Sequence, residues 1–332
     1  MTPEEALELA RTAGIHRLRI PTPFAVGRVN CYLIEDRPLT LVDTGPNSGK
    51  SLDELERQLS ALGHSLEQIE LVILTHQHID HLGLVEVIAG RSGADVAAID
   101  VVAPFVENFG EDIESDDRFA ADLVLSHGIP EDVVIALRSV SRSFRAWGAR
   151  AKVTRPLHDG EELAMQERKL QVQHRPGHSP SDTLFWDSER EILIAADHLI
   201  AHISSNPLIS RPLDGAADRP KALMTYMQSL RRTRELPARI VLPGHGEPIT
   251  DHRALIDERL ELHRQRAEKI FALIEERPRT AYEIAQELWG NVAVTQAFLT
   301  LSEVIGHVDV LEAEGRVREI AEGDRIRFEA VG

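Results

Sequence analysis

The sequence predicts a mixed α/β protein, because strand-like apolar runs alternate with helical patterns along most of the chain. Residues 16 to 45 alternate short apolar runs with turns, which is typical of strands. Four later strand-like runs each lead into a histidine or aspartate, and they are Ile69–Leu74, Leu170–His174, Ile192–Ala195 and Arg239–Leu242. Polar side chains held by rigid turns at strand ends are well placed to form a site.

The first part of the chain contains two expected strands and one marked helix. Asn30–Ile34 and Leu39–Val42 have the apolar character of strands. A helix is expected to begin at Ser51, with Glu54 completing a capping box, and to stop at Gly63.

Residues 101 to 150 interrupt the strand pattern and are expected to be largely helical. This segment holds five of the chain's aromatic residues, namely Phe105, Phe109, Phe119, Phe144 and Trp147. One interpretation is a helical layer that packs these rings into the domain core. The alternative is a lid whose aromatic wall holds an apolar acyl group. In that case polar substitution of Phe105 and Phe109 raises KM for long-chain substrates more than for short ones.

A boundary is predicted near residue 250, followed by a different pattern. Three helices are expected at about residues 251–276, 280–290 and 295–314, and two hairpin strands at 316–320 and 325–328. Thr280 to Glu283 form a capping box at the start of the second helix. A long linker helix followed by helices and a β-wing is typical of a winged-helix domain.

The composition is that of an ordinary soluble globular protein of 332 residues, which is enough for two domains. The acidic start does not look like a secretory signal, and no apolar stretch reaches the roughly 18 residues of a membrane span. Cys31 is the only cysteine, and its apolar neighbours indicate a buried strand position rather than a reactive thiol. We therefore expect a cytoplasmic location and no membrane partner.

The most informative segment is Thr75–His81, which places four potential metal ligands within six positions. His76 and His78 are two apart, so both rings can point to one side of an extended turn. Asp80 and His81 follow the bend and can reach a neighbouring point. Because the two pairs of ligands reach different points, one short segment could bind two metals. Imidazole and carboxylate groups are ligands that suit zinc, iron or manganese.

Three later turns supply further ligands of the same kind. His178 lies in a Gly/Pro turn, Asp197 directly follows an apolar run, and His245 lies between two glycines. On these residues the chain resembles the metallo-β-lactamase fold superfamily over about residues 15 to 250. The segment His76–His81 matches the family's HxHxDH motif in full, and Leu41–Gly45 is similar to its early strand-and-turn signature.

The resemblance implies a four-layer αβ/βα sandwich with metals at one edge between the two sheets. Residues 1–250 would form this domain, with the helical insert at about 101–150, and residues 251–332 the linker helix and winged-helix domain. One departure is Ala196, where many relatives have glycine before the bridging acid. This changes backbone freedom and not ligation.

The resemblance also implies a ligand set for two divalent metal ions, zinc first, with iron or manganese as alternatives. One metal would bind His76, His78 and His178, the other would bind Asp80, His81 and His245, and Asp197 would bridge them. A water between two such cations loses its proton near neutral pH. Asp80 would hold this nucleophile and shuttle its proton.

The expected activity is binuclear metal-dependent hydrolysis of a small-molecule acyl substrate, which is a thioester, an ester or a lactone. The resemblance places the chain near the glyoxalase-II-like and β-lactamase-like protein 2 hydrolases, which have the C-terminal winged helix. An alternative is a metal-dependent endoribonuclease, because the second group includes ribonucleases. A third is a non-catalytic binding scaffold, although such a chain should have lost a ligand.

The charge of the chain counts against nucleic acid as a partner. The net charge is −17, which repels phosphates at long range. Residues 264–332 hold nine Lys and Arg against thirteen Asp and Glu, and the third helix has no Lys or Arg. We therefore interpret this module as packing against the catalytic domain or forming a homodimer, rather than binding DNA.

Several polar residues near the motifs have open roles. His198 and His202 could face the pocket, but a surface or structural placement is expected for each rather than a direct contact with substrate, and His198 could instead orient Asp197. Asn206 could donate a hydrogen bond to substrate. Ser179 and Ser181 are interpreted as turn residues. Recognition of CoA or nucleotide portions would need positive charge, which could come from Arg211, Arg219 and Lys221.

Overall fold

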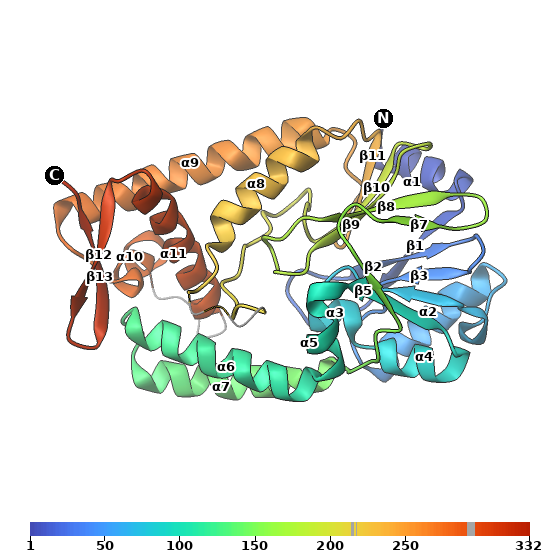
Figure 1. The fold of residues 1–332 in the computed structure, drawn as a ribbon, viewed down its shortest axis with the longest axis horizontal. Coiled ribbons are helices and arrows are strands. Elements are labelled where there is room, and N and C mark those ends of the chain that lie inside the picture. The colour runs from blue at the N-terminus through green and yellow to red at the C-terminus, as the bar shows by residue number, and fades with distance from the viewer. Residues whose placement is uncertain (214–215, 217, 291–295) are drawn as a thin grey trace.

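A computed structural model describes residues 1–213, 216, 218–290 and 296–332 of the chain. Two β-sheets are stacked at one end of the molecule, with helices on their outer faces (Figure 1). The first sheet contains, in spatial order, β1 (Ile15–Ile20), β2 (Val29–Ile34), β3 (Thr40–Val42), β4 (Leu71–Ile73), β5 (Asp95–Ile99) and β6 (Arg155–Leu157). The second contains β11 (Ile240–Pro243), β10 (Ile192–Ala196), β9 (Thr183–Asp187), β8 (Lys169–His174) and β7 (Glu162–Ala164).

Both sheets mix parallel and antiparallel pairs. In the first sheet, β1, β2 and β3 pair antiparallel, whereas β3 to β6 pair parallel. In the second sheet only β10 and β11 are parallel. The parallel strands β3 and β4 therefore end at the same edge, where the chain turns into the predicted site.

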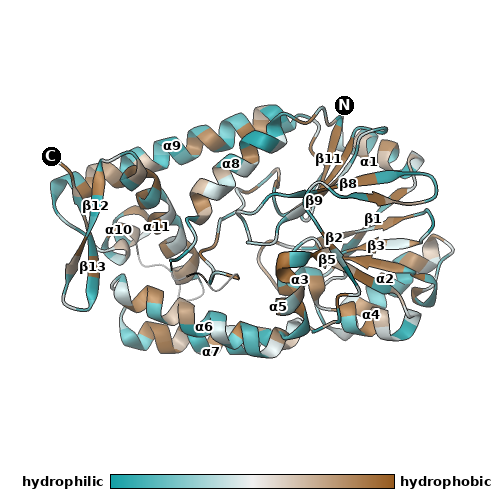
Figure 2. Ribbon diagram, viewed as in Figure 1, coloured by the Kyte–Doolittle hydropathy of each residue, from teal (hydrophilic) through white to brown (hydrophobic). Residues whose placement is uncertain are grey.

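The core lies between the two sheets. Every residue of β2, β9 and β10 is buried, which explains why these strands appear as continuous apolar runs in the sequence. One cluster joins Leu33 and Val72 of the first sheet to Val172 and Ile194 of the second. Figure 2 shows the strands as predominantly hydrophobic and the outer helices as mixed. The predicted four-layer sandwich is confirmed.

Short helices complete the layers around the sheets. These are α1 (Pro3–Thr12), α2 (Gly49–Ala61), α3 (Ile79–Leu82), α4 (Val85–Ser92) and α8 (Ala222–Arg234). The predicted start of α2 was wrong by two residues, because Ser48 caps it by accepting a hydrogen bond from the Ser51 amide. Glu54 forms no capping box and instead accepts hydrogen bonds from Arg57.

The segment 101–150 is helical, as predicted. It contains α5 (Ala103–Glu107), α6 (Phe109–Ser126) and α7 (Glu131–Phe144). Figure 1 shows α6 and α7 extending side by side from the sandwich toward the C-terminal region. We call α6 and α7 the insert.

The C-terminal region has the predicted three helices and hairpin. They are α9 (His252–Glu276), α10 (Ala281–Trp289), α11 (Ala297–Ala313), β12 (Val317–Glu322) and β13 (Arg325–Ala330). Asp251 caps α9, and Thr280 and Glu283 form the predicted capping box of α10. The predicted start of α11 at Thr295 lies outside the described residues. We call residues 252–332 the C-terminal module.

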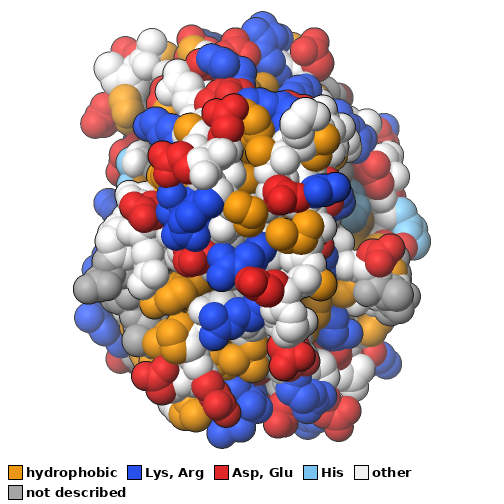
Figure 3. Space-filling view, turned by 90° about the vertical axis from the view of Figure 1, so that its left-hand side faces the viewer, with side chains coloured by type: hydrophobic (Ala, Val, Ile, Leu, Met, Phe, Trp, Pro, Cys, Tyr) orange, Lys and Arg blue, Asp and Glu red, His pale blue; other side chains and the backbone are white. Residues whose placement is uncertain are grey.

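The helix α11 is packed inside the molecule. His307 and Asp309 are buried, and Asp309 forms a two-pronged ion pair with Arg219. Figure 3, which looks onto the C-terminal end, shows acidic and basic side chains interspersed. The C-terminal module therefore packs against the rest of the chain, one of the two predicted arrangements.

The C-terminal module shares a hydrophobic core with the insert. Val124 and Val134 of the insert belong to the same buried cluster as Ile284, Leu301 and Phe328. The insert and the C-terminal module thus lie on opposite sides of the predicted boundary at residue 250, but their side chains pack together.

Candidate metal centre

Four predicted ligands lie at one sheet edge, directly after β4. His76 and His78 occupy the turn that follows the strand, and Asp80 and His81 lie in the first turn of α3. The short strand is fully buried and fixes the start of this turn. As predicted, the chain bends between the two pairs, because α3 begins directly after His78.

The first group of candidate ligands is His76, His78 and His178. The Nδ1 atom of His78 lies 3.1 Å from Nε2 of His76 and 3.0 Å from Nε2 of His178. His178 comes from the turn between β8 and β9. Ligand nitrogens around a tetrahedral zinc with Zn–N distances of about 2.0–2.1 Å are roughly 3.3 Å apart, so this spacing suits a shared cation.

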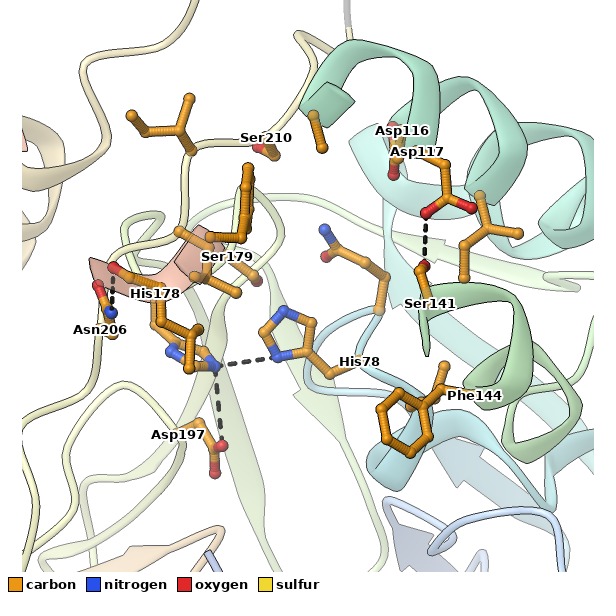
Figure 4. A pocket seen from close by; sticks show the side chains of 18 of the residues that line it. His78, Asp116, Asp117, Ser141, Phe144, His178, Ser179, Asp197, Asn206 and Ser210 are labelled. Atoms are coloured by element: carbon orange, nitrogen blue, oxygen red, sulfur yellow. Dashed lines mark hydrogen bonds and ion pairs between the residues drawn. The ribbon is translucent and has the colours of Figure 1, made fainter. Parts of the chain in front are cut away.

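The second group is Asp80, His81 and His245, with Asp197 beside it. The Nε2 atom of His245 lies 3.3 Å from Asp80 Oδ2 and 3.5 Å from Asp197 Oδ2. The Nε2 atom of His81 lies 3.5 Å from Asp197 Oδ1. Asp197 Oδ2 is also 3.7 Å from His178 Nε2 of the first group, as Figure 4 shows. Asp197 therefore lies between the two groups.

Several of these residues have a buried nitrogen or oxygen atom without a hydrogen-bond partner, which a metal ion would satisfy. Within the described residues, His81 Nε2, His245 Nε2 and Asp197 Oδ1 are buried and form no hydrogen bond. Buried polar atoms are otherwise almost always paired. In three triplets drawn from the seven residues, the candidate ligand atoms lie within 4.8 Å of one another. The donor set of imidazoles and carboxylates suits a divalent cation.

The protonation states also suit ligation. Burial and the neighbouring histidines lower the pKa of His76 well below its usual range, and burial and His178 lower the pKa of His78 to about 3. Burial opposes ionisation of Asp197, but His245 and His81 hold its pKa well below the usual range. The site thus offers two neutral rings, His76 and His78, beside an ionised carboxylate. Burial opposes protonation of His81 and His245, but Asp197 and the neighbouring carboxylates raise the pKa of both, so these two rings must lose a proton when they bind a metal.

Asp43 orients the ring of His81. From the sequence, this residue was known only as part of the strand-and-turn signature Leu41–Gly45. Its Oδ2 lies 2.7 Å from His81 Nδ1, and the carboxylate also accepts hydrogen bonds from the amide and hydroxyl of Thr75. This fixes the His81 ring so that Nε2 points toward Asp197. Asp43 has φ of 59°, an uncommon conformation for this residue that the surrounding structure maintains.

The second strand of the first sheet positions His245. Asn30 donates to the carbonyls of Pro243 and Gly246, and Tyr32 donates to Pro243 from 2.6 Å. Nδ1 of His245 lies 2.9 Å from the Arg28 carbonyl, which directs its Nε2 toward the other ligands.

Two small residues lie beside Asp197. A Cβ at Gly244 would lie 2.1 Å from Asp197 Oδ1, so only glycine fits there. Ala196, the predicted departure from the family, has φ of 44°. The alanine therefore adopts a left-handed conformation that glycine adopts more easily.

The neighbouring histidines are not ligands. His198 is buried, its Nε2 lies 2.9 Å from the Thr233 hydroxyl, and burial lowers its pKa to about 3. Its carbonyl accepts a hydrogen bond from Tyr226. His202 is exposed, as expected. His198 thus holds the segment after Asp197 through a structural hydrogen bond.

Ser179 and Ser181 are turn residues, as interpreted from the sequence. Ser179 donates to the buried carboxylate of Asp182 from 2.6 Å, and Ser181 donates to Gln77. Asn206 lines the cavity described below, but its amide donates to the Leu299 carbonyl.

A cavity of about 750 Å³ opens above the ligands. Figure 4 shows His78, His178 and Asp197 at its base, Phe144 and Ser141 on one side, and Asn206 on the other. Its apolar lining includes Ile113, Phe119, Val124, Val134, Leu137, Phe144, Ile200, Ile203, Leu208, Ile209 and Phe298. Pockets of roughly 300–1,000 Å³ hold drug-sized ligands, so an extended small molecule fits.

The predicted aromatic residues divide between core and cavity. Phe105 and Phe109 belong to the main core, and only Phe105 of the two also touches the cavity. Phe119 and Phe144 line the cavity. The core interpretation therefore holds for Phe105 and Phe109, and a lid that holds an acyl group stays a prediction.

The predicted positive charges are already neutralised by the protein. Arg211 pairs with Asp112 and Asp116. Arg219 pairs with Asp309, and Lys221 with Glu312. The suggestion that these three residues recognise a phosphate group is not supported by this arrangement.

The chain belongs to the metallo-beta-lactamase superfamily, whose family model matches residues 25–245. It is 36% identical to "Probable metallo-hydrolase YqjP" of Bacillus subtilis over 96% of this chain and 99% of that protein. It is 22% identical to "Beta-lactamase-like protein 2 homolog" of Drosophila melanogaster over 90% of this chain and 87% of that protein. The resemblance inferred from the motifs is confirmed, and hydrolase function and divalent-metal use are supported.

A solved structure agrees over the whole chain. A metallo-beta-lactamase family protein from Thermus thermophilus has a TM-score of 0.79 at 29% identity, covering 96% of this chain and 99% of that one. A partial relative, "Atrochrysone carboxyl ACP thioesterase" of Aspergillus fumigatus, is 24% identical over 54% of this chain and 41% of its own length. In the described part of the chain, no helix is both long and apolar enough to cross a membrane.

Proposed function

We propose that this protein is a binuclear metal-dependent hydrolase that cleaves the acyl bond of a small thioester, ester or lactone. The observation that carries this proposal is the position of the seven candidate ligands at the base of a predominantly apolar cavity. The ligands set the type of reaction, and the cavity sets the type of substrate.

The proposed ligands divide as the motif implies. His76, His78 and His178 would hold one divalent cation, Asp80, His81 and His245 the other, and Asp197 would touch both. Zinc is proposed first, with iron or manganese as alternatives. When bound, such a pair activates water and stabilises the negative charge that develops on the substrate oxygen.

Asp80 is the proposed catalytic residue. It lies at the base of the cavity with one oxygen 3.3 Å from His245 Nε2, and the histidines hold its pKa below the usual range although burial opposes this. An ionised carboxylate here can orient an attacking water and accept its proton. The described residues show no base paired with Ser179 or Ser181, because Ser179 donates to Asp182 and Ser181 to Gln77.

The cavity favours an acyl group over a polynucleotide. Its walls are largely aliphatic and aromatic, and Arg211 is bound to two aspartates. A strand of RNA would need an uninterrupted basic path, which the paired charges described here do not provide. The thioesterase name of the partial fungal relative agrees with acyl chemistry.

The test is hydrolysis by full-length protein of measured metal content, with panels of acyl thioesters, lactones and single-stranded RNA. We expect metal-dependent cleavage of a thioester or lactone. Asp80→Ala should reduce kcat by about 10²–10⁴-fold, the usual range for loss of general acid–base catalysis, without a loss of fold. Asp53→Ala, an exposed carboxylate on α2, is the matched control and should leave kcat unchanged.

Two results would contradict the proposal. RNA cleavage with the same metal and Asp80 dependence, and no acyl turnover, would identify the endoribonuclease alternative. Stable metal binding without turnover of any substrate class would favour the non-catalytic scaffold.

A further inference from the structure

The C-terminal module contributes directly to the cavity above the metal ligands. Phe298 and Leu299 in the first turn of α11 line it, together with residues of the sandwich and the insert. These two residues lie more than 50 positions beyond the last predicted ligand, His245, and outside the part of the chain that the family model matches. The wall of the site is therefore not confined to the metallo-β-lactamase domain.

One loop connects this wall to two of the candidate ligands. Ser205 donates to the carbonyl of Asp197 from 2.5 Å, and the Leu208 amide donates to the carbonyl of His178 from 3.4 Å. The same loop reaches α11, because Asn206 donates to the Leu299 carbonyl from 3.1 Å. In Figure 4, Asn206 lies beside His178 and across the cavity from Phe144. A substrate above the metals would thus lie between the insert and α11.

The two walls are held at a fixed separation by their common core. His127, just after α6, stacks on Phe328 of the hairpin with ring centroids 5.6 Å apart. Its carbonyl accepts a hydrogen bond from the Tyr282 amide of α10. A Cβ at Gly128 would lie 2.8 Å from the Thr280 hydroxyl, so the backbones approach closely. The width of the cavity is therefore built into the packing of the C-terminal module on the insert.

We propose that the C-terminal module is a substrate-binding element, and that Phe298 sets the length of acyl chain that the site accepts. This rests on the proposed function of the metal centre. The substrate class is a medium- or long-chain acyl group. A short chain bound at the metals would leave most of the cavity of about 750 Å³ unfilled. Each further methylene buried there adds roughly fourfold to binding.

The experiment changes the size of residue 298 in the full-length, metal-loaded protein. The substrates are N-acetylcysteamine thioesters with butanoyl, octanoyl, dodecanoyl and hexadecanoyl chains. Phe298→Trp should shift the chain-length optimum of kcat/KM to shorter chains. For the longest chain that the wild type cleaves efficiently, kcat/KM should fall roughly tenfold, equal to about 1.4 kcal/mol. Phe298→Ala should shift the optimum to longer chains. Turnover of the butanoyl substrate should change less than turnover of the longer chains in both variants.

Thr300→Ala is the matched control, because Thr300 lies in the same turn of α11 but its hydroxyl bonds only to the carbonyls of Gln296 and Ala297. It should keep the wild-type profile. Melting temperature and metal content of each variant separate a change in specificity from a loss of fold. The inference is overturned if both Phe298 variants keep the wild-type optimum, or if all chain lengths lose turnover equally.

A binding measurement separates this inference from the proposed reaction. S-dodecyl and S-butyl thioethers of N-acetylcysteamine cannot be hydrolysed, and their affinities can be measured by calorimetry. If no thioester is cleaved but the dodecyl compound binds more tightly and Phe298→Trp removes this preference, the reaction is wrong and the role of the C-terminal module stands. If thioesters are cleaved but dodecyl and butyl thioethers bind equally, the module is not a chain-length determinant.

Discussion

The molecule contains two clusters of buried histidines, and only one of them has the environment of a metal site. The first is the seven-residue centre at the sheet edge. The second, in the C-terminal module, consists of His263 on α9 and Glu303 and His307 on α11, whose candidate ligand atoms also lie within 4.8 Å of one another. Distances alone therefore do not separate the two clusters.

The hydrogen bonds separate them. In the C-terminal cluster, Nδ1 of His307 lies 2.6 Å from the Glu303 carbonyl and must donate to it, so its Nε2 is an acceptor. That Nε2 lies 3.3 Å from His263 Nδ1, which can donate to it. The two rings thus form a chain of hydrogen bonds between neutral groups. At the metal centre, in contrast, Nε2 of His76 and Nε2 of His178 both face the single Nδ1 atom of His78. The Nε2 atoms of His81 and His245 have no hydrogen-bond partner.

The charges separate the clusters as well. Three carboxylates, Asp43, Asp80 and Asp197, surround the metal centre and raise the pKa of His81 although burial opposes this. In the C-terminal cluster, Arg266 Nη1 lies 3.1 Å from Glu303 Oε1 and already neutralises it. Burial lowers the pKa of His263 and of His307 to about 4. The same residue types thus form a candidate ligand set in one place and a packed, neutralised cluster in the other.

The largest expected difference between the clusters follows removal of one carboxylate from each. Asp197→Asn takes away the group that lies between the two proposed metals. Metal content should fall below two equivalents, and turnover should fall by at least about 100-fold, because residues that merely orient a ligand already cost about 10–100-fold. Plasma emission spectrometry and kcat measure the two effects.

Glu303→Gln is the matched change in the C-terminal cluster. It should leave both the metal content and kcat within about twofold of wild type, and should lower only the melting temperature. A loss of metal on Glu303→Gln would show that the second cluster is also a metal site and would break the comparison.

The candidate metal ligands could be proposed from the sequence because most of them are neighbours in the chain. His76 to His81 lie in one turn, and His178, Asp197 and His245 each follow a strand or lie in a marked turn. The order of strands and the helices of the C-terminal module were also predictable, since apolar periodicity and capping residues are local signals.

What the sequence could not provide are contacts between distant segments. Arg211 was named as one source of positive charge for a CoA or nucleotide portion of the substrate. Its partner Asp112 lies 99 positions away, and no local pattern links the two. The role of Asp43 was hidden for the same reason, because His81 lies 38 positions further on. Phe298 was absent from the predicted site, since nothing local shows that a C-terminal helix reaches the metal cavity.

A smaller effect is expected from acid. The folded-state pKa of His263 and of His307 is about 4, below the unfolded value of about 6.5. The unfolded chain therefore binds more protons between these values, and the free energy of unfolding decreases as the pH falls from about 6.5 to about 4. Replacing both residues with leucine should flatten this dependence, as measured by melting temperature in metal-free protein.

The metal-centre histidines titrate in the wild type and the double variant alike, so they cancel in the difference between the two melting curves. His158→Leu, which changes an exposed histidine, is the control and should keep the wild-type slope. An unchanged slope in the double variant would mean that these rings are not held neutral by burial.

The smallest expected effect tests whether Arg266 is what keeps the second cluster free of metal. Arg266→Gln removes the cation that neutralises Glu303, leaving one carboxylate and two neutral rings within ligand distance. Added zinc should then raise the melting temperature of this variant beyond that of wild type. A zinc concentration ten times the dissociation constant would stabilise it by about 1.4 kcal/mol. Arg266→Gln combined with His307→Leu should lose the gain, because one ligand is missing. If zinc stabilises wild type and Arg266→Gln equally, charge is not what distinguishes the clusters, and the hydrogen-bond chain between the two rings must be the deciding difference.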